Sequence, residues 1–325
     1  MARKKTHNVG PLPPRDGLGA TRARVPDGDG VSAVDFIWHL VATQRHRHPD
    51  DDRDAVLARF AEGLVVKRDG SNLSPDTWLE PGTDVFFYRR PAPEPPVPFT
   101  ITTVFEDDDV LVVDKPPFLA TMPRASHITE TATVRLRRAT GNEELTPAHR
   151  LDRATSGLLL LTKRREIRGA YQELFARREV SKEYEAIAPL LDAPSAPWRH
   201  HLDKQPGEPA ARVIPEAEPN AETVVADVTR LDATVEDALS SRYGVTGPLG
   251  RYVLQPITGR THQLRVQMMV EAAPILGDRI YPTLLPAETE DFSLPMLLRC
   301  VRLGFTDPLT GQPRDFRLSG DWPDR

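Results

Sequence analysis

The chain has 325 residues and a net charge of −5, so about two domains are expected and a histone-like, uniformly basic binder is disfavoured. Its single cysteine, Cys300, allows neither an intrachain disulfide nor a cysteine-based zinc site. No apolar run approaches the ~20 residues of a membrane span, and the first residues lack the apolar core of a signal peptide, so we expect a protein of the reducing cytoplasm without a membrane partner.

Charge and proline divide the chain. Residues 1–26 carry a net charge of +5 and four prolines without an apolar period, which predicts a flexible basic arm. A small domain is expected over residues 27–90. Five prolines within residues 91–98 predict a stiff linker. The linker precedes the main domain, which we expect over residues 99–325.

The small domain is predicted from its apolar spacing. Helical stretches lie within 34–62, with a polar loop over 46–52, and strand-like runs follow near 63–66 and 84–88. The His and Asp residues of the loop match no metal-ligand spacing, so a solvated loop is the better interpretation. Residues 27–114 carry a net charge of −10, which weakens an RNA-binding role for this domain.

Two strands are predicted after the linker, at 101–105 and 110–113, joined by the acidic run 106–109. A hairpin turn explains this run best, because Asp favours turns. A magnesium site built from Asp107 to Asp109, as in a nuclease, remains the alternative.

The rest of the chain mixes helices and strands without a regular βαβ alternation, which predicts an α+β fold. The expected elements are strand 158–161, helix 165–178, strands 181–187, 223–231 and 250–257, a helix near 260–272, and strands near 297–305 and 314–318, with a proline-rich loop over 192–221.

The first candidate site precedes the apolar run 158–161. In an extended chain Arg150 and Asp152 point to one side while Leu151 packs on the other. Positive charge from Arg150 and Arg153 favours an ionised carboxylate. An ionised carboxylate in a basic cleft suits a base or nucleophile that acts on an anionic polymer. A turn residue in an ordinary salt bridge is the alternative for Asp152.

Two further stretches hold candidate residues. Tyr184, within a strand, offers a ring for stacking a base and a hydroxyl for a proton, although strand tyrosines are often core residues. On the predicted helix near 260–272, His262 and Arg265 share a face, whereas Arg260 and Arg265 cannot share one partner. One arginine could reach a carboxylate and the other a phosphate. Two solvated helix arginines are the alternative.

Together these stretches resemble the motifs of the RluA-type RNA pseudouridine synthase family. Five elements match in order and spacing over about residues 100–317: Val113-Asp114-Lys115-Pro116, His149-Arg150-Leu151-Asp152 with Thr155-Ser156-Gly157-Leu158, Lys182-Glu183-Tyr184, Gly259-Arg260-Thr261-His262-Gln263-Leu264-Arg265-Val266, and Gly277-Asp278-Arg279-Ile280-Tyr281.

The resemblance implies a mixed, mainly antiparallel central sheet flanked by helices. It also implies isomerisation of uridine to pseudouridine in rRNA or tRNA without cofactor or metal. By resemblance, Asp152 starts cleavage of the glycosidic bond, Tyr184 stacks on the flipped uracil, and Arg265 pairs with Asp152. The residues expected to bind RNA are Arg150, Arg153, Lys115, Arg260 and His262.

The sequence departs from the family pattern at positions that bear on substrate fit. Pro117 follows Lys115-Pro116 where glycine is frequent, Gln267 replaces a usual histidine, and Pro282 replaces a usual glycine. Residues 33–90 loosely resemble a small ribosomal-protein-type RNA-binding domain, in a degenerate and acidic form. A non-catalytic RNA-binding or assembly protein remains the alternative function.

Overall fold

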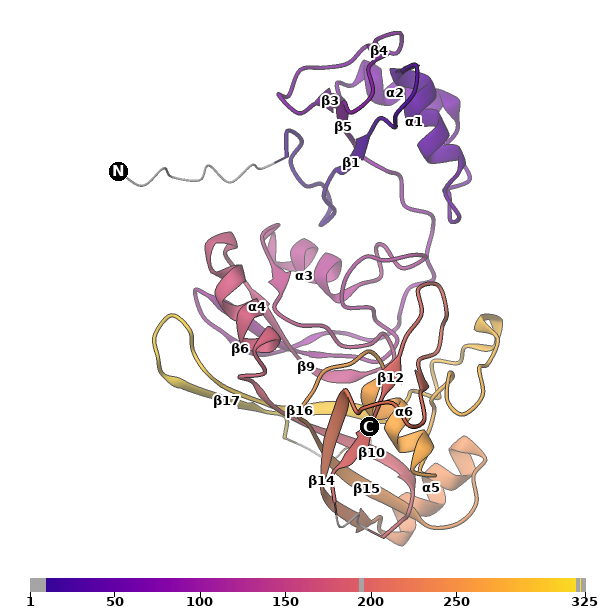
Figure 1. Cartoon of the computed structure of the whole chain (residues 1–325), viewed down its shortest axis with the longest axis vertical. Coiled ribbons are helices and arrows are strands. Elements are labelled where there is room, and N and C mark those ends of the chain that lie inside the picture. Colours follow the sequence, from indigo (N-terminus) through magenta and orange to yellow (C-terminus); the bar gives the residue numbers. More distant parts are fainter. Residues whose placement is uncertain (1–9, 193–195, 320–321, 323–325) are drawn as a thin grey trace. The chain divides into compact units, whose positions relative to one another are not determined.

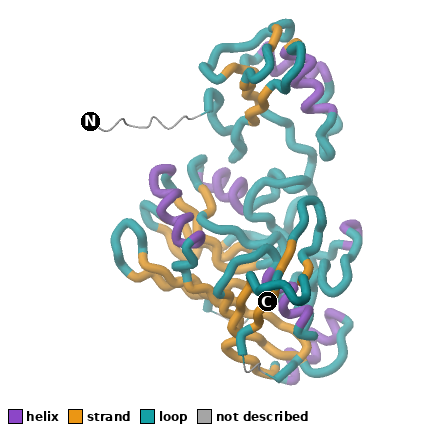
Figure 2. Tube along the Cα trace, in the orientation of Figure 1, coloured by secondary structure: helices purple, strands orange, loops and turns teal. Residues whose placement is uncertain are grey.

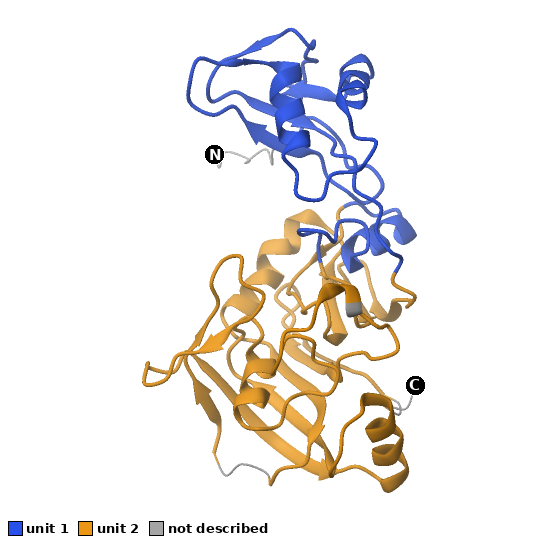
Figure 3. Cartoon of the chain, turned by 90° about the vertical axis from the view of Figure 1, so that its right-hand side faces the viewer, with its two compact units in different colours: residues 1–96, 122–143 blue, residues 97–121, 144–325 orange. Residues whose placement is uncertain are grey.

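The computed structural model describes residues 10–192, 196–319 and 322, and the chain forms two compact units (Figure 3). Unit 1 comprises residues 1–96 and 122–143, and unit 2 comprises residues 97–121 and 144–325. The chain first passes from unit 1 to unit 2 within the proline-rich segment 91–98.

Unit 1 is built on a three-stranded antiparallel sheet in the order β1-β5-β3 (Figure 1). Side chains of α1 and α2, such as Ile37 and Val56, share one buried cluster with Val65, Val85 and Phe87 of the sheet. The elements are β1 (Thr21–Arg24), β2 (Val31–Ser32), α1 (Ala33–Ala42), α2 (Arg53–Ala61), β3 (Val65–Lys67), β4 (Trp78–Leu79), β5 (Asp84–Phe87) and α3 (Ala132–Thr140).

Capping side chains explain where these helices begin. The Ser32 hydroxyl accepts a hydrogen bond from the Asp35 N–H at 3.3 Å, and the Asp52 carboxylate accepts one from the Ala55 N–H at 2.9 Å. Such caps satisfy N–H groups that have no partner within the helix. Asp52, the last residue of the polar loop over 46–52, is therefore the residue that caps the start of α2.

Unit 2 contains a ten-stranded sheet whose main path runs β11-β14-β15-β10-β16-β9-β7-β6, with β17 on β16 and β8 on β9 (Figures 1 and 2). All its pairings are antiparallel except that of β16 with β9, which confirms the predicted mixed, mainly antiparallel sheet. Its strands are β6 (Thr102–Glu106), β7 (Val110–Lys115), β8 (Thr146–Pro147), β9 (Ser156–Thr162), β10 (Ser181–Pro189), β11 (Trp198–His200), β14 (Ala221–Arg230), β15 (Leu249–Pro256), β16 (Leu298–Thr306) and β17 (Pro313–Arg317). Strands β12 (Leu202–Asp203) and β13 (Arg212–Val213) form a separate two-stranded antiparallel sheet.

The helices of unit 2 are α4 (Arg168–Ala176), α5 (Ala233–Tyr243) and α6 (Gln263–Val270), with 3-10 turns at Arg165–Ile167 and Ala287–Thr289. Leu264 and Met268 anchor α6 against the sheet, in a cluster with Tyr252 and Leu254 of β15. This packing fixes the start of α6 beside the end of β15.

The parallel pairing of β9 with β16 requires a glycine at position 157. Gly157 has φ +105°, and a Cβ there would lie 2.2 Å from the carbonyl oxygen of Cys300. Only glycine accommodates both the backbone conformation and this close approach. Cys300 of β16 pairs with Gly157 of β9 on one side and with Tyr184 of β10 on the other, so Gly157 and Tyr184 lie on either side of one strand.

Several sequence predictions need correction. The prediction of a flexible arm over 1–26 is wrong for Thr21–Arg24, which pair with β5; residues 1–9 lie outside the described residues. The predicted loop 192–221 contains β11, β12 and β13, although 193–195 also lie outside the described residues. Helices α3 and α5 were not foreseen.

Candidate active site

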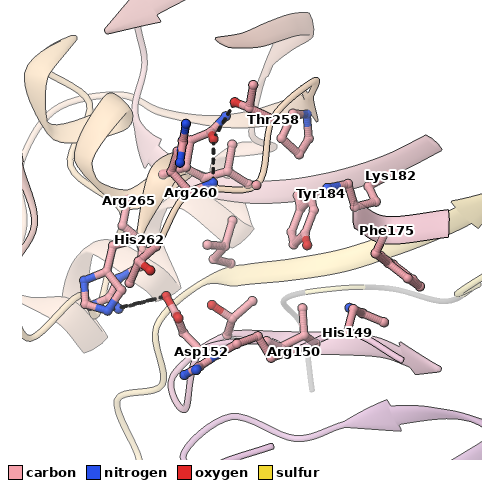
Figure 4. Close-up of a pocket in the computed structure, with 18 of the residues that line it drawn as sticks. His149, Arg150, Asp152, Phe175, Lys182, Tyr184, Thr258, Arg260, His262 and Arg265 are labelled. Carbon is pink, nitrogen blue, oxygen red and sulfur yellow. Dashed lines mark hydrogen bonds and ion pairs between the residues drawn. The ribbon is translucent and has the colours of Figure 1, made fainter. Parts of the chain in front are cut away.

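A cavity of about 510 Å³ opens in unit 2 where the three central sequence motifs meet (Figure 4). Its walls come from the loop before β9, the end of α4, the start of β10 and the segment between β15 and α6. In the view of Figure 4, Tyr184 and Arg260 lie above the space and Asp152 lies below it. Six of the eight predicted site residues line the cavity: Arg150, Asp152, Tyr184, Arg260, His262 and Arg265.

Asp152 lies in the connection between β8 and β9, with its side chain 21% exposed. The buried Leu151 beside it is held by the Thr121 hydroxyl, which donates to the Leu151 carbonyl at 2.7 Å and accepts from its N–H at 3.1 Å. Leu151 is therefore buried, and it lines the cavity together with Arg150 and Asp152.

Arg265 bridges two carboxylates. Its Nε and Nη2 each donate to Asp278 at 2.7 Å, and its Nη1 donates to Asp152 Oδ2 at 3.3 Å. Burial disfavours the charged guanidinium, but the hydrogen bonds and charge of Asp278, followed by the charge of Asp152, raise the pKa of Arg265 above its ordinary value. The bridge ties the Asp152 loop to the segment after α6, and it excludes the alternative of a solvated helix arginine.

His262 immediately precedes α6 in a left-handed backbone conformation, with φ 58°. Its Nδ1 lies 2.9 Å from the Tyr281 hydroxyl, and its Nε2 lies 3.8 Å from Asp152 Oδ2. Burial lowers the pKa of His262, and the opposing effect of Asp152 does not outweigh it. The imidazole is therefore neutral near pH 7.

Tyr184 is half-buried on β10, opposite Cys300 of β16. Burial, then the neighbouring Cys300 thiol, raises the pKa of Tyr184 well above its ordinary value. Burial likewise raises the pKa of Cys300 to about 12. The phenol thus carries its proton and can act as a hydrogen-bond donor beside an open ring face.

His149 and Phe175 also line the cavity, and their rings stack with centroids 4.4 Å apart. His149 Nε2 accepts the Leu160 N–H at 3.1 Å, and burial lowers the pKa of His149 to about 3. These two rings are therefore uncharged, whereas Lys182, which also lines the cavity, carries a charge that acts on His149. Arg150 and Arg260, by contrast, are exposed at the cavity.

Two predicted RNA-binding residues do not reach the cavity. The prediction for Lys115 is wrong, because this side chain is 0% exposed and its Nζ donates to the carbonyls of Pro116 and Leu119, each at 2.8 Å. Burial lowers the pKa of Lys115 to about 7. The Arg153 guanidinium instead pairs with Glu290 at 2.5 and 2.6 Å.

The acidic run between β6 and β7 is a hairpin turn, as predicted. Asp107 Oδ1 accepts the N–H groups of Asp109 and Val110 at 2.9 and 2.8 Å, and Asp107 Oδ2 pairs with Arg314 at 2.9 Å. These partners occupy the carboxylate that the nuclease alternative requires. Within residues 10–192, 196–319 and 322, no group of three or more His, Cys, Asp or Glu residues is arranged to hold a metal ion.

The departure at Gln267 lies outside the cavity. This fully buried side chain accepts the Thr223 hydroxyl at 2.6 Å and donates to the Trp198 carbonyl at 3.2 Å, which links α6 to the sheet. The sequence assigned no role to Asp278 or Tyr281, although both lie in the downstream motif. Their position in that motif was the signal in the sequence that could have identified them as site residues.

Comparison with known proteins agrees with this geometry. Residues 109–269 match the family model described as RNA pseudouridylate synthase. The dual-specificity RNA pseudouridine synthase RluA of Escherichia coli K12 is 30% identical over 234 residues, covering 70% of this chain and 97% of that protein. RluA of Haemophilus influenzae is 29% identical over 233 residues, with the same coverage of both chains.

A solved human structure, RNA Pseudouridylate Synthase Domain Containing 1, has the same fold. It aligns with a TM-score of 0.52 and 23% identity, covering 70% of this chain and 86% of that chain. Among the helices formed by the described residues, none is long and apolar enough to span a membrane.

Proposed function

This chain belongs to the RluA-type RNA pseudouridine synthases and isomerises uridine to pseudouridine in RNA, and we propose that Asp152 initiates this reaction. The observation that carries the proposal is the carboxylate of Asp152 in the cavity, bridged by Arg265 and flanked by the ring of Tyr184. Nothing in the comparisons favours the alternative of a non-catalytic assembly protein.

The proposed reaction begins with a uridine that has left its stack, which costs a few kcal/mol. Asp152 either attacks the sugar or removes a proton from it, and the bond between the sugar and uracil N1 breaks. The uracil turns and its carbon-5 bonds to the sugar. Loss of the carbon-5 proton and protonation of N1 complete an isomerisation that needs no net gain or loss of atoms.

Each neighbour of Asp152 has a proposed part. Tyr184 stacks on the uracil, since its ring borders the cavity. Its high pKa supports a role for the hydroxyl as a donor rather than as the final base. Arg265 orients Asp152. Arg150 and Arg260, both exposed at the cavity, hold backbone phosphates of the RNA.

The decisive experiment replaces Asp152 by Asn in the full chain and follows tritium release from RNA labelled at carbon-5 of uridine. We expect no release with the fold and RNA affinity retained, because the amide keeps the shape but not the charge. Tyr184→Phe serves as the companion variant and should retain RNA binding. Wild-type release by Asp152→Asn would refute the proposal.

The substrate is proposed to be rRNA or tRNA in the cytoplasm; mapping pseudouridine in total RNA with and without the protein tests this. Unit 1 is proposed to contact the RNA through a cavity of about 1100 Å³ lined by six arginines: Arg15, Arg45, Arg59, Arg89, Arg90 and Arg138. Reversing the charge of Arg45 and Arg89 should weaken RNA affinity, whereas Arg24→Ala, outside that cavity, should not.

A further inference from the structure

Two hydrogen bonds link the backbone of Ala211 to His262, whose ring in turn faces the carboxylate of Asp152. The Tyr281 hydroxyl accepts the Ala211 N–H at 2.6 Å. The same hydroxyl lies 2.9 Å from Nδ1 of His262, whose Nε2 is 3.8 Å from Asp152 Oδ2. Tyr281 is 4% exposed and the His262 side chain 12%, so both lie largely out of solvent.

The positions of the protons follow from this arrangement. The single proton of the Tyr281 hydroxyl can go to His262 Nδ1 at 2.9 Å or to the Ala211 carbonyl at 3.2 Å. If Nδ1 accepts it, the ring proton lies on Nε2 and points towards Asp152. In the other tautomer, a nitrogen lone pair would face a carboxylate oxygen, which is repulsive. The shorter distance from the Tyr281 hydroxyl to Nδ1 and the negative charge of Asp152 therefore both favour the tautomer with its proton on Nε2.

The contacts also make the two oxygens of Asp152 unequal. Arg265 Nη1 and His262 Nε2 both approach Oδ2. Among the described residues, no hydrogen bond or ion pair is made to Oδ1. A carboxylate with one oxygen held and the other open presents a defined lone pair to a bound nucleotide.

We propose that His262 is a positioning residue, whose Nε2–H is oriented by Tyr281 and holds Asp152 Oδ2 together with Arg265, so that Oδ1 acts on the nucleotide. This inference rests on the proposed role of Asp152. It replaces the RNA contact predicted for His262 from the sequence. The 3.8 Å separation closes to a hydrogen bond when the nucleotide engages Oδ1 and the carboxylate turns.

Two substitutions at His262 isolate its donor. His262→Gln retains an N–H at a similar distance from the backbone, whereas His262→Met fills similar space without one. Both replacements must adopt the same left-handed backbone conformation, so the strain that they introduce is matched. We measure single-turnover conversion at saturating enzyme, RNA affinity by filter binding, and the rate between pH 5 and pH 9.

The expected results separate positioning from binding and from folding. His262→Met should slow the single-turnover rate about tenfold or more, with RNA affinity within about twofold of the wild type. His262→Gln should restore the rate to within about threefold of the wild type. The pH dependence of the rate should also differ between the two variants, because only the Gln variant keeps an N–H that can donate to the carboxylate of Asp152.

The pH profile depends on every charged group around this pair. Lys115, Arg265 and Asp278 also act on Asp152 or His262. Lys204 acts on His262 as well. These groups are unchanged between the Gln and Met variants, so a difference between the two profiles reports the donor alone.

Tyr281→Phe tests the relay itself. It should slow the rate about threefold to tenfold in the wild type but add little to His262→Met, because both act through one donor. Equal rates for the Gln and Met variants, lower affinity with an unchanged rate, or additive effects of Tyr281→Phe and His262→Met would each overturn the inference. If Asp152→Asn is inactive but His262→Met is fully active, the inference fails while the proposed function stands.

Discussion

Replacing Arg265 by Met should both destabilise unit 2 and abolish catalysis. Asp278 is 1% exposed and Arg265 4%, so the substitution leaves a buried carboxylate without its charged partner. Breaking a buried ion pair in this way costs about 3–5 kcal/mol. For a unit of this size, the loss corresponds to a fall in Tm of about 6–20 °C.

A second substitution separates the two effects. Asp278→Asn removes the unpaired charge but keeps an oxygen for the N–H groups of Ile280 and Tyr281, which Asp278 Oδ1 accepts at 2.8 and 3.2 Å. The double variant Arg265→Met/Asp278→Asn should therefore regain much of the lost stability. It should remain inactive, because no guanidinium holds Asp152.

Arg265→Lys provides the control for charge. A lysine keeps the positive charge but lacks the planar fork that bridges two carboxylates, so we expect a stable protein with a reduced rate. Thermal unfolding and tritium release from uridine-labelled RNA measure the two quantities. The reasoning is refuted if the double variant recovers activity along with stability, since stability alone would then account for the loss.

Three further substitutions test residues that support the backbone or the wall of the site. Gly157→Ala should prevent close pairing of β9 and β16 and cost more than about 4 kcal/mol, because its Cβ would lie 2.2 Å from the Cys300 carbonyl oxygen. Thr121→Val should cost about 1–3 kcal/mol and slow the reaction, because both backbone groups of Leu151 lose their partner. His149→Phe should reduce the loss of stability on acidification. Between pH 7 and pH 5 the wild type should lose about 2 kcal/mol more stability than the variant, because the imidazole gains a proton in the unfolded chain but not in the folded one, where its pKa is about 3.

Each of these outcomes can fail in a definite way. A soluble Gly157→Ala protein with unchanged Tm would contradict the conclusion that β9 and β16 lie too close together for a Cβ at position 157. Full activity of Thr121→Val would show that the Asp152 loop is held by other contacts. Parallel loss of stability on acidification in the wild type and in His149→Phe would mean that His149 takes a proton in the folded state.

The local hydrophobic pattern was sufficient to predict a helix or strand where that element packs against the core. The apolar run at Leu158–Leu161 predicted β9, and helical spacing within 34–62 predicted α1 and α2. Helix α5 was missed because its apolar face is weak, with Leu239 as its buried residue. Helix α3 was missed because it is short and arginine-rich, although it buries Ala132, Val134 and Leu136. Their ends did carry signals, since Thr131 caps α3 and Gly244 ends α5 in the left-handed region.

The fate of a charged side chain depends on contacts that sequence spacing does not reveal. Lys115 was predicted to bind RNA, yet carbonyls of Pro116 and Leu119 and, at 3.4 Å, of Arg153 surround its ammonium group. Only the meeting of the segment after β7 with the Asp152 loop creates that enclosure. In the same way, Asp278 is the main partner of Arg265 because the segment after α6 folds back to this arginine.

Tyr184 shows why the centre of the site could be named but not built from the sequence. The pairing of β10 with β16 shifts register between Glu183 and Tyr184, so that Glu183 pairs with Arg302 and Tyr184 with Cys300. Such a bulge belongs to a pair of strands, not to either strand alone, and it re-aims the side chain beside it. Strict alternation along β10 therefore cannot say which way Tyr184 points. Its place in the cavity with Asp152 depends on the partner strand as much as on its own motif.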